Sequence, residues 1–233
     1  MSISDSISRL ISYYKRHGVK ATLQRGKVFV SRLFSSNRLV IYSYDLSKSE
    51  AISSSRAWPE SLSVVRVTSQ EQIEKQDWLQ IINFWDAKLS ERNFNTRFRE
   101  GASVWLIRSD GKLAGFGWTL TGRSIKPHFF PFGPNDVHLF DFLVFPEFRG
   151  KGMNPLLVTH ILEQLGKERR TRAFIEAAEW NHAQLNSLAK TCFQMLGVAR
   201  KRAILGRTFV EWGKAPHPAE PSGAHATAKP RVL

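Results

Sequence analysis

The sequence contains one cysteine, Cys192, among its 233 residues. A single cysteine excludes an intramolecular disulfide and a zinc cluster built on cysteines, and we predict no metal site and a reducing, cytoplasmic setting. Acidic residues are scarce too: 34 Lys and Arg stand against 20 Asp and Glu, which gives a formal net charge of +14. Such a charge favours anionic partners, namely nucleic acid, an anionic membrane surface or a phosphate-rich ligand.

Long apolar runs are missing as well. No run approaches the roughly 18 residues of a membrane-spanning helix, and the N-terminal stretch lacks the basic and apolar regions of a signal peptide. Modules for binding nucleic acid, such as paired zinc ligands or a basic zipper, are not recognisable, so we predict no nucleic-acid partner. With 42% hydrophobic residues the chain can still bury a substantial core.

The ends of the chain differ in composition from its middle. Residues 1–38 contain eight basic residues and a single acidic one, arranged in two amphipathic helical patterns. Two interpretations stay open: a helical hairpin packed on the main domain, or a surface that rests on anionic lipids at the inner face of the membrane. We therefore divide the chain into a basic extension (1–60), a main domain (61–213) and a disordered tail (214–233). The sequence leaves open whether the protein forms a homodimer.

Hydrophobic periodicity predicts the elements of the main domain. The expected strands are Arg38–Leu46, Leu62–Thr68, two strands on either side of Asp110-Gly111, Val137–Phe145, Arg172–Ala178 and Val198–Val210. The expected helices run from Gln70 to about Trp85, from about Ala87 to Arg99, from about Met153 to Glu168, and from Gln184 to Met195. Asp-Gly between two strand-like runs is a strong signal for a tight β-hairpin.

The stretch F-P-E-F-R-G-K-G-M-N-P-L-L, Phe145–Leu157, joins a strand to a helix. Gly150 and Gly152 allow a sharp turn and the close approach of a ligand. The free N–H groups of the next helical turn, together with Arg149 and Lys151, would form an anion cradle that suits a pyrophosphate. The alternative is an ordinary tight turn with solvated charges.

Two motifs resemble those of the GNAT acetyltransferase superfamily. Arg149 and Gly152 match its coenzyme A loop, Q/R-x-x-G-x-G/A, whereas Asn154 departs from it. Asn186–Val198 is similar to the family's N-x-x-A-x-x-x-Y-x-x-x-G-F segment, with Phe193 in place of the tyrosine. The Asp110-Gly111 hairpin also looks like the family's central hairpin, and the resemblance spans roughly residues 64–210.

The resemblance implies an α/β fold with a mixed, mostly antiparallel sheet, splayed parallel strands and flanking helices. It implies acetyl-CoA, or another acyl-CoA, with the pantetheine arm between residues 138–145 and 172–178. It further implies direct transfer of the acyl group to an amine, without an acyl-enzyme. The residues implied in coenzyme binding are Phe142, Leu143, Val144, Arg149, Gly150, Lys151, Gly152, Met153, Asn154, Asn186 and Phe193.

Three residues are candidates for accepting the proton of the amine. Asp141 lies among aromatic residues that would raise the pKa of a buried carboxyl, although it is equally suited to order a loop or to pair with an arginine. His138 is the second candidate, and strand alternation predicts that it faces away from Asp141. Glu176, with Glu179 nearby, is the third. Phe193 cannot protonate the leaving thiolate as the family tyrosine commonly does.

The acceptor is expected to be a small-molecule amine. Phe129, Phe130 and Phe132 in the loop 124–136 either form a pocket wall that packs on a sugar face or fill the core. The basic N-terminal helices loosely resemble those of acetyltransferases of bacterial surface polysaccharides, which suggests an amino sugar. The alternatives are a lipid-linked acceptor or a non-catalytic acyl-CoA-binding module. Cys192 is interpreted as a buried apolar residue.

Overall fold

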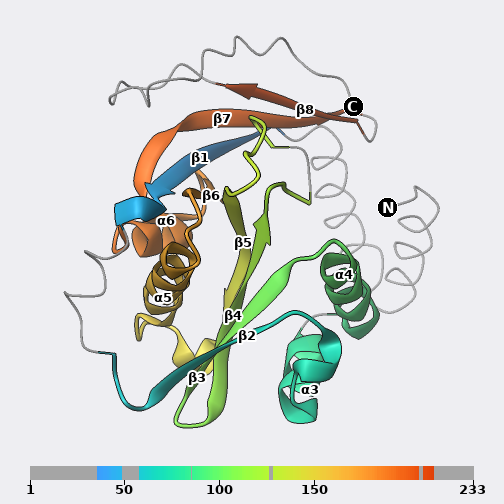
Figure 1. The fold of residues 1–233 in the computed structure, drawn as a ribbon. Helices are drawn as coiled ribbons and strands as arrows, with labels where there is room; N and C mark the ends of the chain where they lie inside the picture. Colours follow the sequence, from blue (N-terminus) through green and yellow to red (C-terminus); the bar gives the residue numbers. More distant parts are fainter. Residues whose placement is uncertain (1–35, 49–57, 85, 126–127, 205–206, 213–233) are drawn as a thin grey trace.

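The computed structural model describes residues 36–48, 58–84, 86–125, 128–204 and 207–212. Its described strands form one eight-stranded sheet in the order β2-β3-β4-β5-β6-β1-β7-β8 (Figure 1). The strands are β1 Ser36–Asp45, β2 Leu62–Val67, β3 Ser103–Ser109, β4 Lys112–Thr121, β5 Val137–Val144, β6 Arg172–Ala178, β7 Gln194–Ile204 and β8 Arg207–Trp212. Neighbouring strands are antiparallel except for the pair β5 and β6, so the predicted mixed sheet is confirmed.

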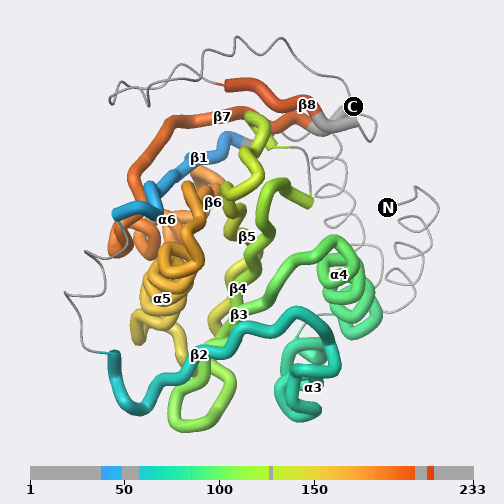
Figure 2. The backbone as a smooth tube through the Cα atoms, viewed as in Figure 1, coloured from blue at the N-terminus to red at the C-terminus, as the bar shows by residue number. Residues whose placement is uncertain are grey.

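Helices cover both faces of this sheet (Figure 2). The helical segments are η1 Leu46–Lys48, η2 Gln70–Gln72, α3 Lys75–Phe84, α4 Ala87–Arg99, η3 Pro146–Phe148, α5 Met153–Lys167 and α6 His182–Leu188. One apolar cluster joins α5 and α6 to the inward side chains of β5 and β6, and a second joins α3 and α4 to β3 and β4. The sheet therefore has an apolar core on each of its two faces.

The Asp110-Gly111 hairpin forms as predicted between β3 and β4. Both residues have positive φ angles, 49° and 74°, which the tight turn of a two-residue hairpin requires. The helix expected over residues 184–195 is wrong in its extent, because α6 ends at Leu188. There the Thr191 hydroxyl donates to the Leu188 carbonyl over 2.6 Å, and the chain turns into β7.

The strand β1 changes the domain division made from the sequence. That division assigned residues 36–45 to an N-terminal extension, but β1 lies inside the sheet, antiparallel to both β6 and β7. Burial explains the placement, since Val40 and Ile41 are 7% and 0% exposed. The predicted tail, residues 214–233, and all but the last three residues of the segment 1–38 predicted to hold the helical hairpin lie outside the described residues.

The parallel strands β5 and β6 are paired over only three positions. Val137, His138 and Leu139 pair with Ala173, Phe174 and Ile175, and the pairing then stops. Beyond this point β5 remains bonded to β4 alone. The two strands therefore diverge toward their carboxyl ends, as the resemblance implies.

Candidate active site

The loop after β5 is shaped to receive an anion. Gly150 and Gly152 both have φ +76°, and a Cβ added at either would meet nothing within 4 Å. Gly152 is the N-cap of α5 and offers no side chain to cap it. Among the described residues, no acceptor binds the N–H groups of residues 150–154. These amides and the open space around the glycines fit a phosphate group.

The charged side chains of this loop flank the amides. Arg149 is exposed, and its Nε donates to the Val144 carbonyl over 3.1 Å, which fixes the turn against the end of β5. Lys151 is also exposed and lies with its Nζ 5.4 Å from the centroid of the Phe148 ring. The loop thus adds two positive charges to the positive end of the α5 dipole.

A β-bulge bends β5 beside this loop. Asp141 and Phe142 together oppose Gly117 of β4, and Asp141 has φ 48°. The Phe142 ring lies where a Cβ of Gly117 would be, so the bulge depends on glycine at this position. Downstream of the bulge, Leu143 pairs with β4 but not with β6. The segment that the sequence analysis assigned to the pantetheine arm therefore keeps one edge unpaired.

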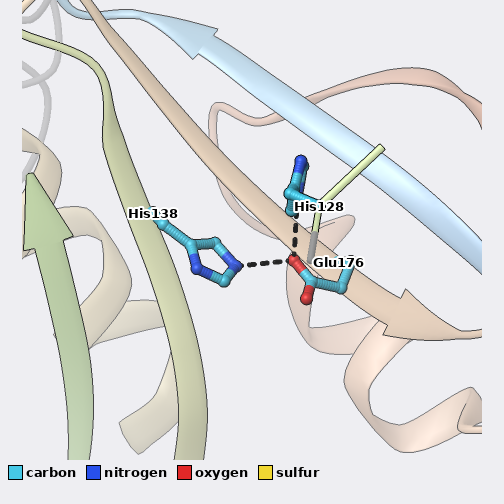
Figure 3. Close-up of side chains that lie close together, drawn as sticks. All are labelled: His128, His138 and Glu176. Carbon is cyan, nitrogen blue, oxygen red and sulfur yellow. Dashed lines mark hydrogen bonds and ion pairs between the residues drawn. The ribbon is translucent and has the colours of Figure 1, made fainter. Parts of the chain in front are cut away.

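Three titratable side chains meet where the parallel strands separate (Figure 3). The Nε2 of His138, on β5, is 2.8 Å from Oε2 of Glu176 on β6. The Nε2 of His128, in the loop before β5, is 3.5 Å from the same oxygen. Glu176 comes directly after Ile175, the last residue of β6 to pair with β5. The cluster therefore sits at the fork between the two strands.

The cluster is shielded from water to different degrees. The side chains of His128, His138 and Glu176 are 4%, 7% and 22% exposed. Burial alone would raise the pKa of the Glu176 carboxyl, but the charges of His138 and His128 and the hydrogen bonds from both rings together hold that pKa well below its usual range. Burial lowers the pKa of His128, and the nearby Glu176 opposes this only in part. Glu176 is therefore an anion and His128 a neutral imidazole near pH 7.

The hydrogen bond to Glu176 sets the tautomer of His138. An ionised carboxylate can only accept, so Nε2 of His138 carries a proton, and in the neutral form of the ring Nδ1 then has a lone pair. Within the described residues, this buried Nδ1 has no hydrogen-bond partner. The arrangement provides a proton acceptor at Nδ1 with an anion behind it at Nε2.

Aromatic side chains surround this cluster. The ring of His128 lies 4.7 Å from that of Phe132 and 4.8 Å from that of Phe130, between centroids. Phe130 and Phe132 also pack on Phe174 of β6. Phe129 is 5% exposed and belongs to a separate apolar cluster with Ile41 and Ala199, although its ring centroid also lies 5.2 Å from that of His128. Two of the three predicted acceptor-binding phenylalanines thus flank the cluster, and the third fills the core.

Comparison with known proteins identifies the protein family of this chain. The sequence matches the model of the family described as Acetyltransferase (GNAT) family over residues 68–192, more than half of the chain. The chain belongs to the GNAT acetyltransferase family. The resemblance found in the sequence is thereby confirmed, and the matched span includes the anion loop and all three residues of the cluster.

Solved structures share the GNAT fold with this chain. A tandem GNAT protein from the clavulanic acid biosynthesis pathway has a TM-score of 0.53 at 19% identity, covering 80% of this chain and 55% of its own. A GNAT acetyltransferase from Colwellia psychrerythraea has a TM-score of 0.50 at 11% identity, with coverages of 83% and 63%. A conserved protein of unknown function from Staphylococcus epidermidis has a TM-score of 0.50 at 13% identity, with coverages of 77% and 65%.

These likenesses show the fold alone, because all three identities are low. The chain spans less than two thirds of the length of each of these structures. A search of curated proteins found no match. Among the described residues of this GNAT chain, no helix combines the length and the apolar character that a membrane span requires.

Asp141 does not have the setting that the sequence suggested for a GNAT base. Its side chain is 60% exposed and forms an ion pair with Arg97 of α4, whose guanidinium lies over the rings of Trp118 and Phe140. The expectation that Asp141 and His138 face opposite ways rested on strict alternation, which the bulge interrupts. Asp141 contacts α4 on the same face of the sheet on which His138 stacks against Phe140.

The remaining predicted coenzyme residues of the GNAT domain have mixed placements. Asn154 uses its side chain to join α5 to α6, donating to Ser187 Oγ over 2.8 Å. Asn186 is exposed on α6, whereas Phe193 is 7% exposed and packs in the core. Cys192 was expected to be buried but is exposed, because its segment is a turn and not a helix.

His128 is the functional candidate that sequence reasoning missed. It is one histidine in an aromatic loop, without a spacing relation to His138 or Glu176 that periodicity could detect. The loop is held in place by Asp136, whose buried carboxylate accepts from Arg172 Nη2 over 2.8 Å and from Thr171 Oγ1 over 2.9 Å. The signal for His128 therefore lies in the tertiary structure.

Proposed function

We propose that this protein is an acetyl-CoA-dependent N-acetyltransferase that transfers an acetyl group directly to a primary amine. Membership of the GNAT family supports the reaction class. The open anion loop and the diverging strands support the use of a coenzyme A thioester. The observation that carries the proposal is the buried His138–Glu176 pair at the fork of β5 and β6, in which Nδ1 of His138 has no hydrogen-bond partner among the residues that the structure describes.

The residues present fit coenzyme A. The N–H groups of residues 150–154 would hold its pyrophosphate, with Arg149 and Lys151 adding charge. The unpaired edge of β5 after the bulge would hold the pantetheine arm by main-chain hydrogen bonds. When bound, acetyl-CoA supplies an activated acetyl thioester.

His138 is the group best placed to take the proton of the amine. Its Nδ1 accepts that proton, and the anionic Glu176 at Nε2 stabilises the resulting imidazolium. A positioned base of this kind contributes about 10²–10⁴-fold to a rate. Glu176 is a positioning residue in this scheme, because it acts through His138. Asp141 has a structural role, since it is paired with Arg97 at an exposed bulge.

We propose an amino sugar as the acceptor. Phe130 and Phe132 are half-buried beside His128 and present aromatic faces next to the proton acceptor. Aromatic faces of this kind pack well on the apolar face of a sugar ring. For residues 1–38, the basic composition supports peripheral contact with anionic lipids, which would suit a nucleotide-linked or lipid-linked acceptor.

The test is the release of free thiol from acetyl-CoA with a panel of amino sugars and polyamines. We expect turnover with at least one amine, a loss of about 100-fold or more in kcat for His138→Ala, and unchanged affinity for coenzyme A by calorimetry. Asp141→Asn is the matched variant and should retain most of the activity. Tight coenzyme binding without turnover on any amine would instead support a non-catalytic acyl-CoA-binding module. Equal losses in the two variants would contradict the role of His138.

A further inference from the structure

We propose that His128, His138 and Glu176 form a binding site for Zn²⁺, and that the bound ion reversibly blocks the proton acceptor of the enzyme. Metal binding at this site stands independently of the activity, whereas the inhibition rests on the proposed function. From the sequence we predicted no metal site, because a single cysteine excludes a zinc cluster built on cysteines.

The geometry of the three side chains is that of an incomplete metal site. One ligand atom from each residue can be chosen so that all three lie within 4.8 Å of one another. Zinc binds nitrogen and oxygen ligands at about 2.0–2.2 Å in a tetrahedron, so two of its ligands are separated by about 3.3–3.5 Å. His128 Nε2 is already 3.5 Å from Glu176 Oε2, and His138 Nε2, at 2.8 Å, needs to retreat by a fraction of an ångström.

Unused nitrogen atoms point to a missing ligand at this cluster. Within the described part of the chain, neither ring nitrogen of His128 meets the geometry of a hydrogen bond, and Nε2 has only the 3.5 Å contact with Glu176 Oε2. A buried polar atom without a partner is destabilising. A cation between the two imidazoles and the carboxylate would use the lone pair of His128 Nε2 and would balance the charge of Glu176. Glu176 is 22% exposed, which leaves an opening for a water as the fourth ligand.

The donor set favours a borderline metal ion. Two imidazoles and one carboxylate are ligands typical of Zn²⁺ and of neighbouring transition metals, whereas Ca²⁺ and Mg²⁺ prefer several oxygen ligands. Metal-binding histidines usually donate their other N–H to a carbonyl or carboxylate. Here the Nδ1 atoms of both histidines have no such partner among the described residues. The site therefore lacks the outer hydrogen bonds of a permanent zinc centre, and we infer reversible binding.

Coordination would switch off the proton acceptor by changing its tautomer. In the metal-free pair, His138 carries its proton on Nε2 and has a lone pair on Nδ1. A metal ion on Nε2 needs the lone pair there, so the proton of the neutral ring moves to Nδ1 through solvent and no proton is lost. His138 then has no free lone pair for the proton of the amine.

The experiment is a titration of the metal-free full chain with ZnCl₂ against a chromophoric chelator, followed by Co²⁺ substitution. We expect one site that is weakened at least tenfold in His128→Ala and in His138→Ala, with visible Co²⁺ absorption of a tetrahedral centre in the wild type only. His182→Ala, which alters an exposed histidine on α6, is the matched control and should bind as the wild type does. Thermal melting of each variant shows that it is folded.

Two results would overturn the site: equal binding in all variants, or loss of binding only in Cys192→Ser, which would place the ion on the exposed thiol. The inhibition is tested separately with the best amine acceptor. We expect thiol release by the wild type to fall with Zn²⁺ at the concentrations that fill the site and to recover with EDTA. A filled site with full turnover would overturn the block. Absence of any turnover without metal would count against the proposed function, while the chelator titration would still decide the site.

Discussion

A carboxylate placed at Gly152 should abolish most of the affinity for coenzyme A. The glycine precedes the first turn of α5, and a Cβ added there would meet no atom of the described residues within 4 Å. If the carboxylate of Gly152→Asp stood about 4 Å from a bound phosphate, the two unit charges would repel by about 4 kcal/mol at an effective dielectric constant of 20. Because salt screens exposed charges, we expect a loss of about 2–4 kcal/mol, or roughly 30- to 1,000-fold in Kd.

Gly101→Asp provides a matched control for this variant. Gly101 has φ +78° against +76° for Gly152, and an added Cβ meets nothing within 4 Å at either position. Both variants therefore pay a similar backbone strain of about 1–2 kcal/mol, but only one of them places charge in the anion loop. Calorimetric titration with coenzyme A should show normal affinity for Gly101→Asp. Unchanged affinity in Gly152→Asp, or equal losses in both, would remove the assignment of this loop to the pyrophosphate.

Four further outcomes are expected. Asp136→Ala should lower the free energy of unfolding by about 2–3 kcal/mol in denaturant titrations, since it deprives Arg172 and Thr171 of a buried acceptor; a change below 0.5 kcal/mol would contradict this. Gly117→Ala should displace the Phe142 ring, cost about 1–3 kcal/mol of stability and weaken coenzyme binding. Cys192 should react with iodoacetamide in the folded protein but more slowly than free cysteine at pH 8, because partial desolvation of the exposed residue's thiol and then Glu163 raise its pKa. The rate should rise with pH. Deletion of residues 1–35, which removes seven basic residues, should reduce binding to anionic vesicles, and unaltered binding would exclude membrane contact through this segment.

Local patterns in the sequence were sufficient for much of the fold. The predicted bounds of α4, Ala87–Arg99, and of β6, Arg172–Ala178, agree with the structure, because one is a clear amphipathic repeat and the other a short apolar run. The Asp110-Gly111 turn depends only on two residues that tolerate positive φ angles. The turn at Gly150 and Gly152 could be predicted for the same reason, because glycine tolerates the positive φ angles found there. Features set by neighbours in sequence could therefore be predicted.

Features that depend on contacts between distant segments could not be predicted from the sequence. The position of β1 between β6 and β7 depends on the burial of Ile41, which no local pattern assigns to a particular sheet position. The bulge at Asp141 requires that Gly117, on another strand, has no Cβ. Because the bulge was not foreseen, strand alternation wrongly predicted that Asp141 and His138 face opposite sides of the sheet. The ion pair of Asp141 with Arg97 likewise joins residues from different elements. The contact of His128 with Glu176 likewise depends on the tertiary structure and could not be predicted from local sequence.

One structural event brings together the two halves of the proposed site. The pairing of β5 with β6 ends at Leu139 and Ile175, and the side chains on either side of this last pair are His138 and Glu176. The separation of the strands leaves the edge of β5 unpaired where we propose that the pantetheine arm binds, and the His138–Glu176 contact spans the fork where that opening begins. A thioester at the end of this opening would lie next to His138, so no other helix or strand would be needed to bring the thioester and the proton acceptor together. The proton acceptor and the coenzyme gap are therefore fixed by the same register, so a shift in the pairing of β5 and β6 should impair coenzyme binding and turnover together.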